Sequence, residues 1–141
     1  MLDKDFNPEI AQIINLPKFL DPRGNLSFIE QEHNIPFKIE RAYWIYDVPG
    51  GEIRGGHGYL SLREFIVALS GSFDIVLNDG KSETRYHLNR SYYGLYVPKM
   101  IWRSMENFST NSLALILADQ RYNEEEYVRD YKVYQSIKNA E

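Results

Sequence analysis

The sequence predicts an all-β protein in which two antiparallel sheets form a sandwich or barrel, followed by one C-terminal α-helix. Short runs rich in β-branched and aromatic residues recur between residues 13 and 118, and turn-forming residues separate them. Asn78-Asp79-Gly80 is the clearest hairpin signal, because these residue types tolerate the positive φ angles of tight turns. After Asp119 the apolar residues change to helical spacing. Together these observations favour a double-sheet sandwich with a terminal helix.

The expected strands follow from the positions of the turns. Asp21-Pro22-Arg23-Gly24 separates the first two runs, and Pro49-Gly50-Gly51 ends an aromatic run whose rings suit a pleated surface. The run 65–69 is continuously apolar, so we expect it to lie deep between the two sheets. The predicted strands are 13–19, 25–30, 41–46, 65–69, 73–77, 82–88, 93–97, 102–108 and 112–118.

Residues 123–134 carry the signals of a helix. Asn123 can cap its N-terminus, and the three glutamates that follow would complement the helix dipole. The apolar residues at helical spacing are Tyr127, Val128, Tyr131 and Tyr134. We expect this helix to close one end of the sandwich or to lie at the edge of a dimer.

The composition indicates one packed domain over residues 1–141, with its core at about 13–118. The chain is 43% hydrophobic and 14% aromatic, which is enough to fill a core. A formal net charge of −4 argues against binding to nucleic acid or to an anionic membrane surface. Cysteine is absent, which excludes disulfides and thiolate chemistry. The sequence shows no signal-peptide pattern and no apolar run of about 20 residues, so we expect a cytoplasmic protein.

Residues 51–71 are similar in spacing to the first motif of cupins, which are small double-sheet jelly rolls. That motif is Gly, five residues, His, one residue, His, four residues, Glu, six residues and Gly. Its positions are filled here by Gly51, His57, Tyr59, Glu64 and Gly71, with Tyr59 in place of the second His. The second cupin motif is present in degraded form as Pro98, Met100, Arg103 and Asn107. We therefore expect a jelly roll of the cupin type.

The metal-binding positions of the cupin motifs do not hold a metal-binding set here. The usual His, His, Glu and His become His57, Tyr59, Glu64 and Arg103. Arginine does not lose its proton to become a ligand, and borderline metals prefer imidazole, thiolate or carboxylate. We expect no metal and no other cofactor, with the chemistry carried out by side chains alone.

His57 is the best candidate for proton transfer. Its unperturbed pKa near 6.5 suits a base or an acid at neutral pH, and the glycines beside it leave room for a ligand. Tyr59 lies two residues further on, so it faces the same way in an extended segment and can donate a proton or simply pack in the core. Glu64 can hydrogen-bond to an arginine rather than contact substrate.

Arginines and aromatic rings form the candidate binding set. Arginine forks bind phosphate oxygens, and flat rings suit a base or a sugar, as a nucleotide-sugar pocket requires. Arg103 occupies a former metal-ligand position, so we expect it to point inward, and Arg41 shares one strand face with Tyr43. The candidate substrate-binding residues are Arg23, Arg41, Tyr43, Arg54, Tyr96, Trp102 and Arg103.

Over about residues 13–134 the chain resembles the sugar 3,4-ketoisomerase family of WxcM-like bacterial cupins. The order and spacing of several stretches carry this resemblance. They are D-P-R-G-N-L at 21–26, N-I-P-F-K-I-E-R-A-Y at 34–43, R-G-G-H-G at 54–58, L-N-D-G at 77–80, G-L-Y-V-P at 94–98, I-W-R-S-M at 101–105 and L-A-D-Q-R-Y-N-E-E-E-Y-V-R-D-Y at 117–131. The family motif R-G-x-H-x-H has Tyr59 at its second histidine here.

The resemblance implies a metal-independent homodimer that acts on a dTDP-linked keto-deoxysugar, dTDP-4-keto-6-deoxyglucose, in the synthesis of deoxysugars for cell-surface polysaccharide such as O-antigen. It implies that His57 takes part in proton transfer between C3 and C4. Our own hypothesis is that His57 is the base, with Tyr59 as the proton donor and Arg103 or Arg54 stabilising the carbonyl or enediolate. The resemblance places Arg23 and Arg103 at the sugar end of the pocket. Three alternatives stay open: a non-catalytic protein that binds a nucleotide sugar or a partner, an isomerase or epimerase acting at another carbon, and, disfavoured by Tyr59 and Arg103, a metal-dependent oxygenase.

Overall fold

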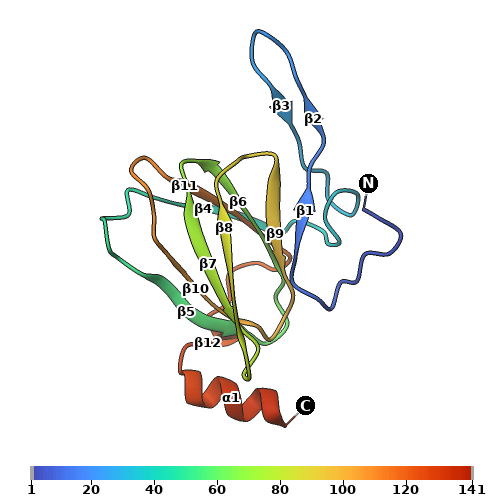
Figure 1. Ribbon diagram of the computed structural model, residues 1–141. Helices are drawn as coiled ribbons and strands as arrows, with labels where there is room; N and C mark the ends of the chain where they lie inside the picture. Colours follow the sequence, from blue (N-terminus) through green and yellow to red (C-terminus); the bar gives the residue numbers. More distant parts are fainter. Residues whose placement is uncertain (1, 141) are drawn as a thin grey trace.

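The computed structural model describes residues 2–140, which form two five-stranded antiparallel sheets and a small separate hairpin (Figure 1). The first sheet has the order β1 (Gln12–Asn15), β9 (Tyr93–Val97), β6 (Glu64–Ser70), β11 (Leu113–Ala118) and β4 (Arg41–Tyr46). The second has the order β12 (Tyr127–Val128), β5 (Arg54–Tyr59), β10 (Trp102–Glu106), β7 (Phe73–Asn78) and β8 (Glu83–Leu88). The predicted cupin-like sandwich with one C-terminal helix is confirmed.

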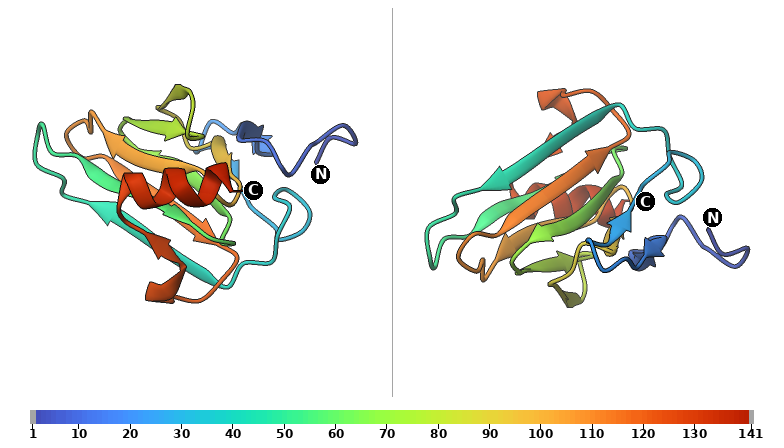
Figure 2. Two further views of the ribbon diagram at one scale, coloured as in Figure 1. Left: turned by 90° about the horizontal axis from the view of Figure 1, so that it is seen from below. Right: turned by 90° about the horizontal axis from the view of Figure 1, so that it is seen from above.

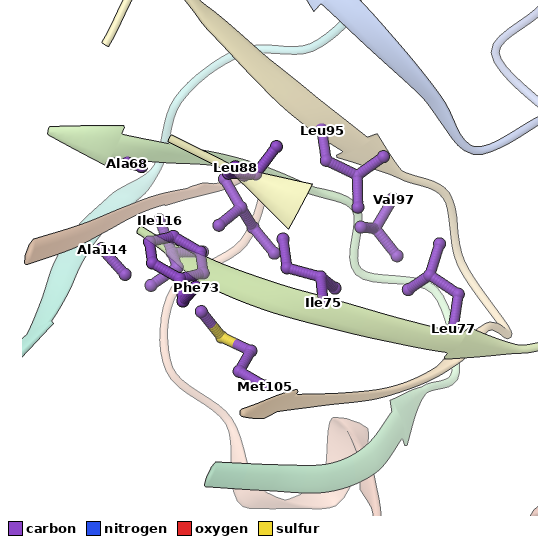
Figure 3. Close-up of a cluster of buried hydrophobic side chains, with 11 residues drawn as sticks. Ala68, Phe73, Ile75, Leu77, Leu88, Leu95, Val97, Met105, Ala114 and Ile116 are labelled. Atoms are coloured by element: carbon purple, nitrogen blue, oxygen red, sulfur yellow. The ribbon is translucent and has the colours of Figure 1, made fainter. Parts of the chain in front are cut away.

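The main core fills the space between the two sheets (Figure 3). Alternate residues of each strand point into it, as strand geometry requires. Its buried members are Ile66, Ala68, Phe73, Ile75, Leu77, Leu88, Leu95, Val97, Met105, Ala114 and Ile116. Apolar side chains therefore fill most of the interior, and the polar residues of the candidate site lie at one edge of the sandwich.

Strand β6 is buried on both faces, which explains its continuous apolar run. Ile66 points into the core between the sheets, whereas Phe65 and Val67 belong to a second cluster with Ile35 and Phe37 of the segment before β4. The prediction that 65–69 lies deep in the sandwich is thus confirmed for its first four residues, and a second apolar layer covers the outer face. Leu69 is 45% exposed.

The prediction that residues 13–19 form a single strand is wrong. This segment divides into β1 and β2 (Lys18–Phe19), because Pro17 between them has no N–H to donate to a ladder. The predicted strand 25–30 is reduced to β3 (Leu26–Ser27), which pairs only with β2. The resulting β2–β3 hairpin projects away from the sandwich (Figure 1).

The predicted helix 123–134 is also wrong in its boundaries. Asn123 does cap a turn, but that turn is a short 3₁₀ helix, η1 (Glu124–Glu126), and the chain then extends as β12. Pairing of β12 with β5 overrides the local helical preference of these residues. The α-helix α1 (Tyr131–Asn139) begins later, where the Asp130 side chain accepts hydrogen bonds from two backbone N–H groups.

Helix α1 lies across one end of the sandwich, the first of the two positions expected for it (Figures 1 and 2). Its buried Tyr134 donates a hydrogen bond to the Met100 carbonyl oxygen at 2.8 Å, and Tyr131 donates to Asn78 Oδ1 at the end of β7 at 3.0 Å. Trp102 packs against both tyrosine rings. Within residues 2–140 no helix is long and apolar enough to cross a bilayer.

Candidate active site

A polar pocket of about 380 Å³ opens between strand β4 of the first sheet and strands β5 and β12 of the second. It lies at the edge of the sandwich, beside the apolar core. Its lining residues are Tyr43, Ile45, Ile53, Arg54, Gly55, His57, Tyr59, Arg103, Tyr127 and Arg129. Most of the titratable residues predicted for the site are therefore gathered in one place.

Strand alternation brings these side chains together. On β4 the partly buried residues alternate with exposed ones, so Arg41, Tyr43 and Ile45 share the inner face, as expected. His57 and Tyr59 share one face of β5, and Arg103 of β10 lies directly opposite His57 in the strand register. The expected inward orientation of Arg103 is confirmed by its 2% exposure.

The His57 imidazole is buried and neutral. Its Nε2 lies 2.9 Å from the Tyr59 hydroxyl oxygen, and its side chain packs against the ring of Tyr127. Burial disfavours the charged form, and the positive charge of Arg103 adds to this effect, so the pKa of His57 falls to about 3. The imidazole therefore keeps a free lone pair throughout the neutral pH range.

A buried ion pair between Arg103 and Glu64 lies next to His57. Arg103 Nε donates to Glu64 Oε1 at 2.6 Å, and Arg103 Nη2 donates to the Tyr43 hydroxyl oxygen at 2.9 Å. The Tyr43 hydroxyl in turn donates to Glu64 Oε2 at 2.5 Å. Burial alone would raise the pKa of Glu64, but the charge and hydrogen bonds of Arg103 outweigh it and the pKa is lowered. The expectation that Glu64 hydrogen-bonds to an arginine is confirmed.

Two glycines around His57 are required for packing, and one of them, Gly55, also lines the pocket. Gly55 has a φ of +102°, and a Cβ there would lie 3.0 Å from the backbone of β10, where the β5–β10 register shifts. A Cβ on Gly58 would lie 3.1 Å from the Tyr134 ring of α1. Glycine therefore lets a neighbouring strand and the helix approach the strand that carries His57.

Four predicted binding residues are not among those that line this pocket, and three of them, Tyr96, Trp102 and Arg23, lie away from it. Tyr96 is fully buried in the cluster on the outer face of the first sheet and donates to the Pro8 carbonyl oxygen at 2.6 Å. Trp102 belongs to the cluster under α1. Arg23 is exposed on the projecting hairpin, where it pairs with Asp21 at 2.8 Å. None of them contributes to the pocket of its own chain.

Sequence reasoning missed two titratable residues that line the pocket, Tyr127 and Arg129. The Tyr127 ring lies 4.8 Å from the Tyr59 ring, and the Arg129 guanidinium lies 4.3 Å over the Tyr127 ring. Assigning them to a helix hid them, although the alternation of Tyr127, Val128 and Arg129 was compatible with a strand. Arg41 does not line the pocket itself, but its Nη2 lies 3.4 Å from the hydroxyl oxygen of the lining residue Tyr127.

The arrangement suits proton transfer next to a carbonyl group. A neutral imidazole can take a proton, and the nearby positive charge can stabilise an oxyanion that forms as it does so. Arg54 and Arg129 line the same pocket and can bind anionic groups of a substrate.

Known proteins with similar sequences and the same fold point the same way. The family model described as FdtA, WxcM-like, C-terminal, matches residues 9–139. A TDP-4-oxo-6-deoxy-α-D-glucose 3,4-oxoisomerase from Aneurinibacillus thermoaerophilus is 39% identical over 120 residues, which cover 85% of this chain and 86% of the relative.

Solved structures of relatives have the same fold. A 3,4-ketoisomerase from Helicobacter canadensis is 40% identical with a TM-score of 0.89, over 92% of this chain and 97% of the other. A mutant 3,4-ketoisomerase from Thermoanaerobacterium thermosaccharolyticum in complex with TDP-4-keto-6-deoxyglucose is 32% identical with a TM-score of 0.90, over 92% and 94% of the two chains. The chain therefore belongs to the WxcM-like family of sugar 3,4-ketoisomerases.

Proposed function

We propose that this protein interconverts the 3-keto and 4-keto forms of a dTDP-linked 6-deoxyhexose, with His57 as the base. The observation that carries this proposal is a neutral, buried imidazole beside Arg103 in a pocket of about 380 Å³. Relatives with 39% and 40% identity are named as 3,4-oxo- or ketoisomerases, which supports the same reaction here.

The proposed reaction moves protons only. His57 removes the C3 proton, the electrons of that C–H bond form a C3–C4 double bond, and the C4 carbonyl oxygen takes the negative charge. The proton then returns to C4, while the hydroxyl proton of O3 is transferred to O4. This leaves a ketone at C3 and a hydroxyl group at C4, so no electron acceptor is required. The positive charge of Arg103 would stabilise the enediolate.

Three arginines around the pocket are proposed to hold the diphosphate. Arg54 and Arg129 line it, and Arg41 reaches its aromatic wall at Tyr127. Within residues 2–140 the buried Arg41 Nε has no hydrogen-bond partner, and we propose that a ligand oxygen supplies one. Two phosphate charges near these arginines would also raise the pKa of His57 when substrate binds, which would strengthen the base at the point where it is needed.

Tyr59 is proposed to act through His57. Its hydroxyl contacts His57 Nε2, and its 3% exposure leaves little surface for substrate. Burial also raises its pKa above that of a free phenol, which weakens it as an acid. We therefore place Tyr59 as the hydrogen-bond partner of the base rather than as the donor to the sugar.

Independence of metal ions is proposed from the chemistry of the former ligand set. Arg103 stands at one ligand position and pairs with Glu64 at another. The test is elemental analysis of purified protein together with turnover after dialysis against a chelator. Activity that is lost on dialysis and regained with a divalent ion would refute the proposal.

A homodimer is proposed from two exposed apolar surfaces. Trp44, Tyr46 and Leu69 are 58%, 61% and 45% exposed on the outer face of the first sheet, and Leu20 is 73% exposed on the projecting hairpin. Patches of this kind usually mark an interface. In such a dimer Arg23 could reach the pocket of the second copy, which would give it the binding role that the resemblance implies. Sedimentation of the purified protein tests the dimer.

The test of the reaction is the variant His57→Asn with dTDP-4-keto-6-deoxyglucose, followed by NMR detection of the 3-keto sugar. We expect turnover by the wild type and none by the variant, and the control His87→Asn, altered at a half-exposed histidine of β8, should retain activity. Full activity of His57→Asn would rule out His57 as the base. Binding of dTDP by the wild type without product, and without solvent deuterium at C3 or C4, would favour the non-catalytic binder.

A further inference from the structure

The inner face of strand β4 changes in character along its length. Near the start of the strand, Arg41 Nη2 lies 3.4 Å from the Tyr127 hydroxyl oxygen. In the middle, the Tyr43 hydroxyl oxygen accepts from Arg103 Nη2 at 2.9 Å. Ile45 is the next residue on this face, and its side chain is aliphatic. The face is therefore polar at its start and apolar where the strand leads into the loop 47–53.

A second isoleucine lies at the other end of this loop. Ile53 directly precedes β5, and the loop joins the end of β4 to the start of β5, so Ile45 and Ile53 lie on the same side of the pocket. Among the lining residues in the described part of the chain, these two have the purely aliphatic side chains. The otherwise polar pocket thus has one apolar part.

The two isoleucines differ in how they are held. Ile45 is partly buried and packs against the main core between the sheets, so its position is fixed by the fold. Ile53 is 63% exposed at the mouth of the pocket. An exposed aliphatic side chain at such a place gains favourable contacts when a ligand with an apolar group covers it.

The sugar of the proposed reaction has an apolar group of matching size, the C6 methyl group. C6 is bonded to C5, and C5 is bonded to the reacting carbon C4. When C3 and C4 lie beside His57, the methyl group must therefore lie within the same pocket, two bonds from C4. The aliphatic side chains are the part of the lining that suits it.

A hydroxyl group at C6 would be poorly accommodated in this apolar part. The nearest polar group along the inner face of β4 is the Tyr43 hydroxyl, and it already donates its one proton to Glu64 Oε2 at 2.5 Å. It has no proton to donate to an added hydroxyl group. A sugar hydroxyl placed against the isoleucines would lose hydrogen bonds to water without full replacement.

We infer that Ile45 and Ile53 form an apolar subsite for the C6 methyl group, which makes the pocket select 6-deoxy sugars over their 6-hydroxy counterparts. The inference rests on the proposed function, because it takes C3 and C4 of the sugar to lie beside His57. It assigns a role in specificity to two residues that take no part in proton transfer.

The test is calorimetric titration of the wild type with dTDP-6-deoxyglucose and with dTDP-glucose, which differ only by the oxygen on C6. We expect the deoxy sugar to bind roughly 10-fold to 100-fold more tightly, the range in which an apolar pocket rejects a ligand with one added hydroxyl group. Equal dissociation constants, or no measurable binding of the deoxy sugar, would overturn the inference. Neither ligand has a ketone, so the titration is separate from turnover. A protein that prefers the deoxy sugar but does not isomerise the keto sugar would support the subsite and refute the proposed reaction.

Variants locate the preference within the pocket. Ile45→Thr keeps a β-branched side chain but supplies a hydroxyl group, so the ratio of the two dissociation constants should fall at least about 5-fold. Both ligands are titrated into the same protein, so a general loss of stability does not change the ratio. Because Ile45 also packs against the core, Ile53→Thr provides the same test at an exposed position, and the ratio should fall there too.

The matched control is Ile10→Thr. Ile10 is 54% exposed and is not among the residues that line this pocket, so the ratio should keep its wild-type value. A ratio that also stays at the wild-type value in Ile45→Thr and in Ile53→Thr would contradict the inference, because the preference would then arise elsewhere in the pocket.

Discussion

Replacing Glu64 by Gln leaves the Arg103 guanidinium buried without its counter-charge. The two side chains are 1% and 3% exposed and joined by an N–O contact of 2.6 Å, so neither can turn to water. Removing one partner of such a pair costs about 3–5 kcal/mol, and the amide can still accept one hydrogen bond, which favours the lower end. For a chain of 141 residues a loss of about 3 kcal/mol lowers Tm by roughly 10 °C. Guanidinium unfolding at pH 7 and calorimetry measure both quantities.

Two further variants separate burial from charge. Glu106→Gln removes one of the two carboxylate partners of Arg85, whose side chain is 50% exposed, and should cost less than about 1 kcal/mol. The double variant Glu64→Gln/Arg103→Met also removes the unpaired buried charge of Arg103, so it should recover most of the free energy of unfolding that Glu64→Gln loses. If Glu64→Gln lowers the free energy of unfolding no more than Glu106→Gln does, the buried ion pair does not stabilise the site.

Three other predictions address the pocket and its support. The folded pKa of His57, about 3, lies below 6.5, so below pH 6.5 the unfolded chain binds the extra proton. The free energy of unfolding should therefore drop by about 2–3 kcal/mol between pH 6.5 and 4.5, and urea unfolding should show a smaller drop in His57→Asn. Gly58→Ala should cost roughly 1–3 kcal/mol, because its methyl group would press on Tyr134 at 3.1 Å, and a Tm equal to that of wild type would contradict this packing. Arg129→Ala should raise KM for the dTDP-sugar at least 10-fold with a smaller effect on kcat, and an unchanged KM would remove Arg129 from the binding set.

Much of the sandwich, apart from strand β5, could be predicted from residue patterns, because most of its strands are runs of apolar and aromatic residues between turn-forming residues. Strands 41–46 and 93–97 have the predicted limits, and Asn78 and Asp79 form the predicted turn through their side chains, which accept from the backbone of residues 80–82. The C-terminal segment failed because two signals overlapped there. The apolar residues of this segment do recur at helical spacing. However, Tyr127 and Val128 pair with strand β5, and this long-range pairing cannot be read from the sequence.

The positions of site residues could be predicted where strand alternation decides which way a side chain points. They could not be predicted where the site depends on segments that are distant in the sequence. The pairing of His57 with Tyr59 follows from their spacing of two, and the burial of Arg103 from its motif position. The motif around Tyr96 gave no indication of its face, and that residue packs on the outer layer of the first sheet. Tyr127 reaches the pocket only because a segment after the last long strand returns to β5.

That return has a consequence for the order in which the protein matures. As the chain leaves the ribosome, the strands up to residue 118 can close the apolar core before the C-terminal segment has emerged. The wall that Tyr127 and Arg129 supply, and the Tyr134 ring that packs against Gly58, come only from the last part to be synthesised. Catalytic competence should therefore appear as a late event, after a compact but inactive β-sandwich has already formed.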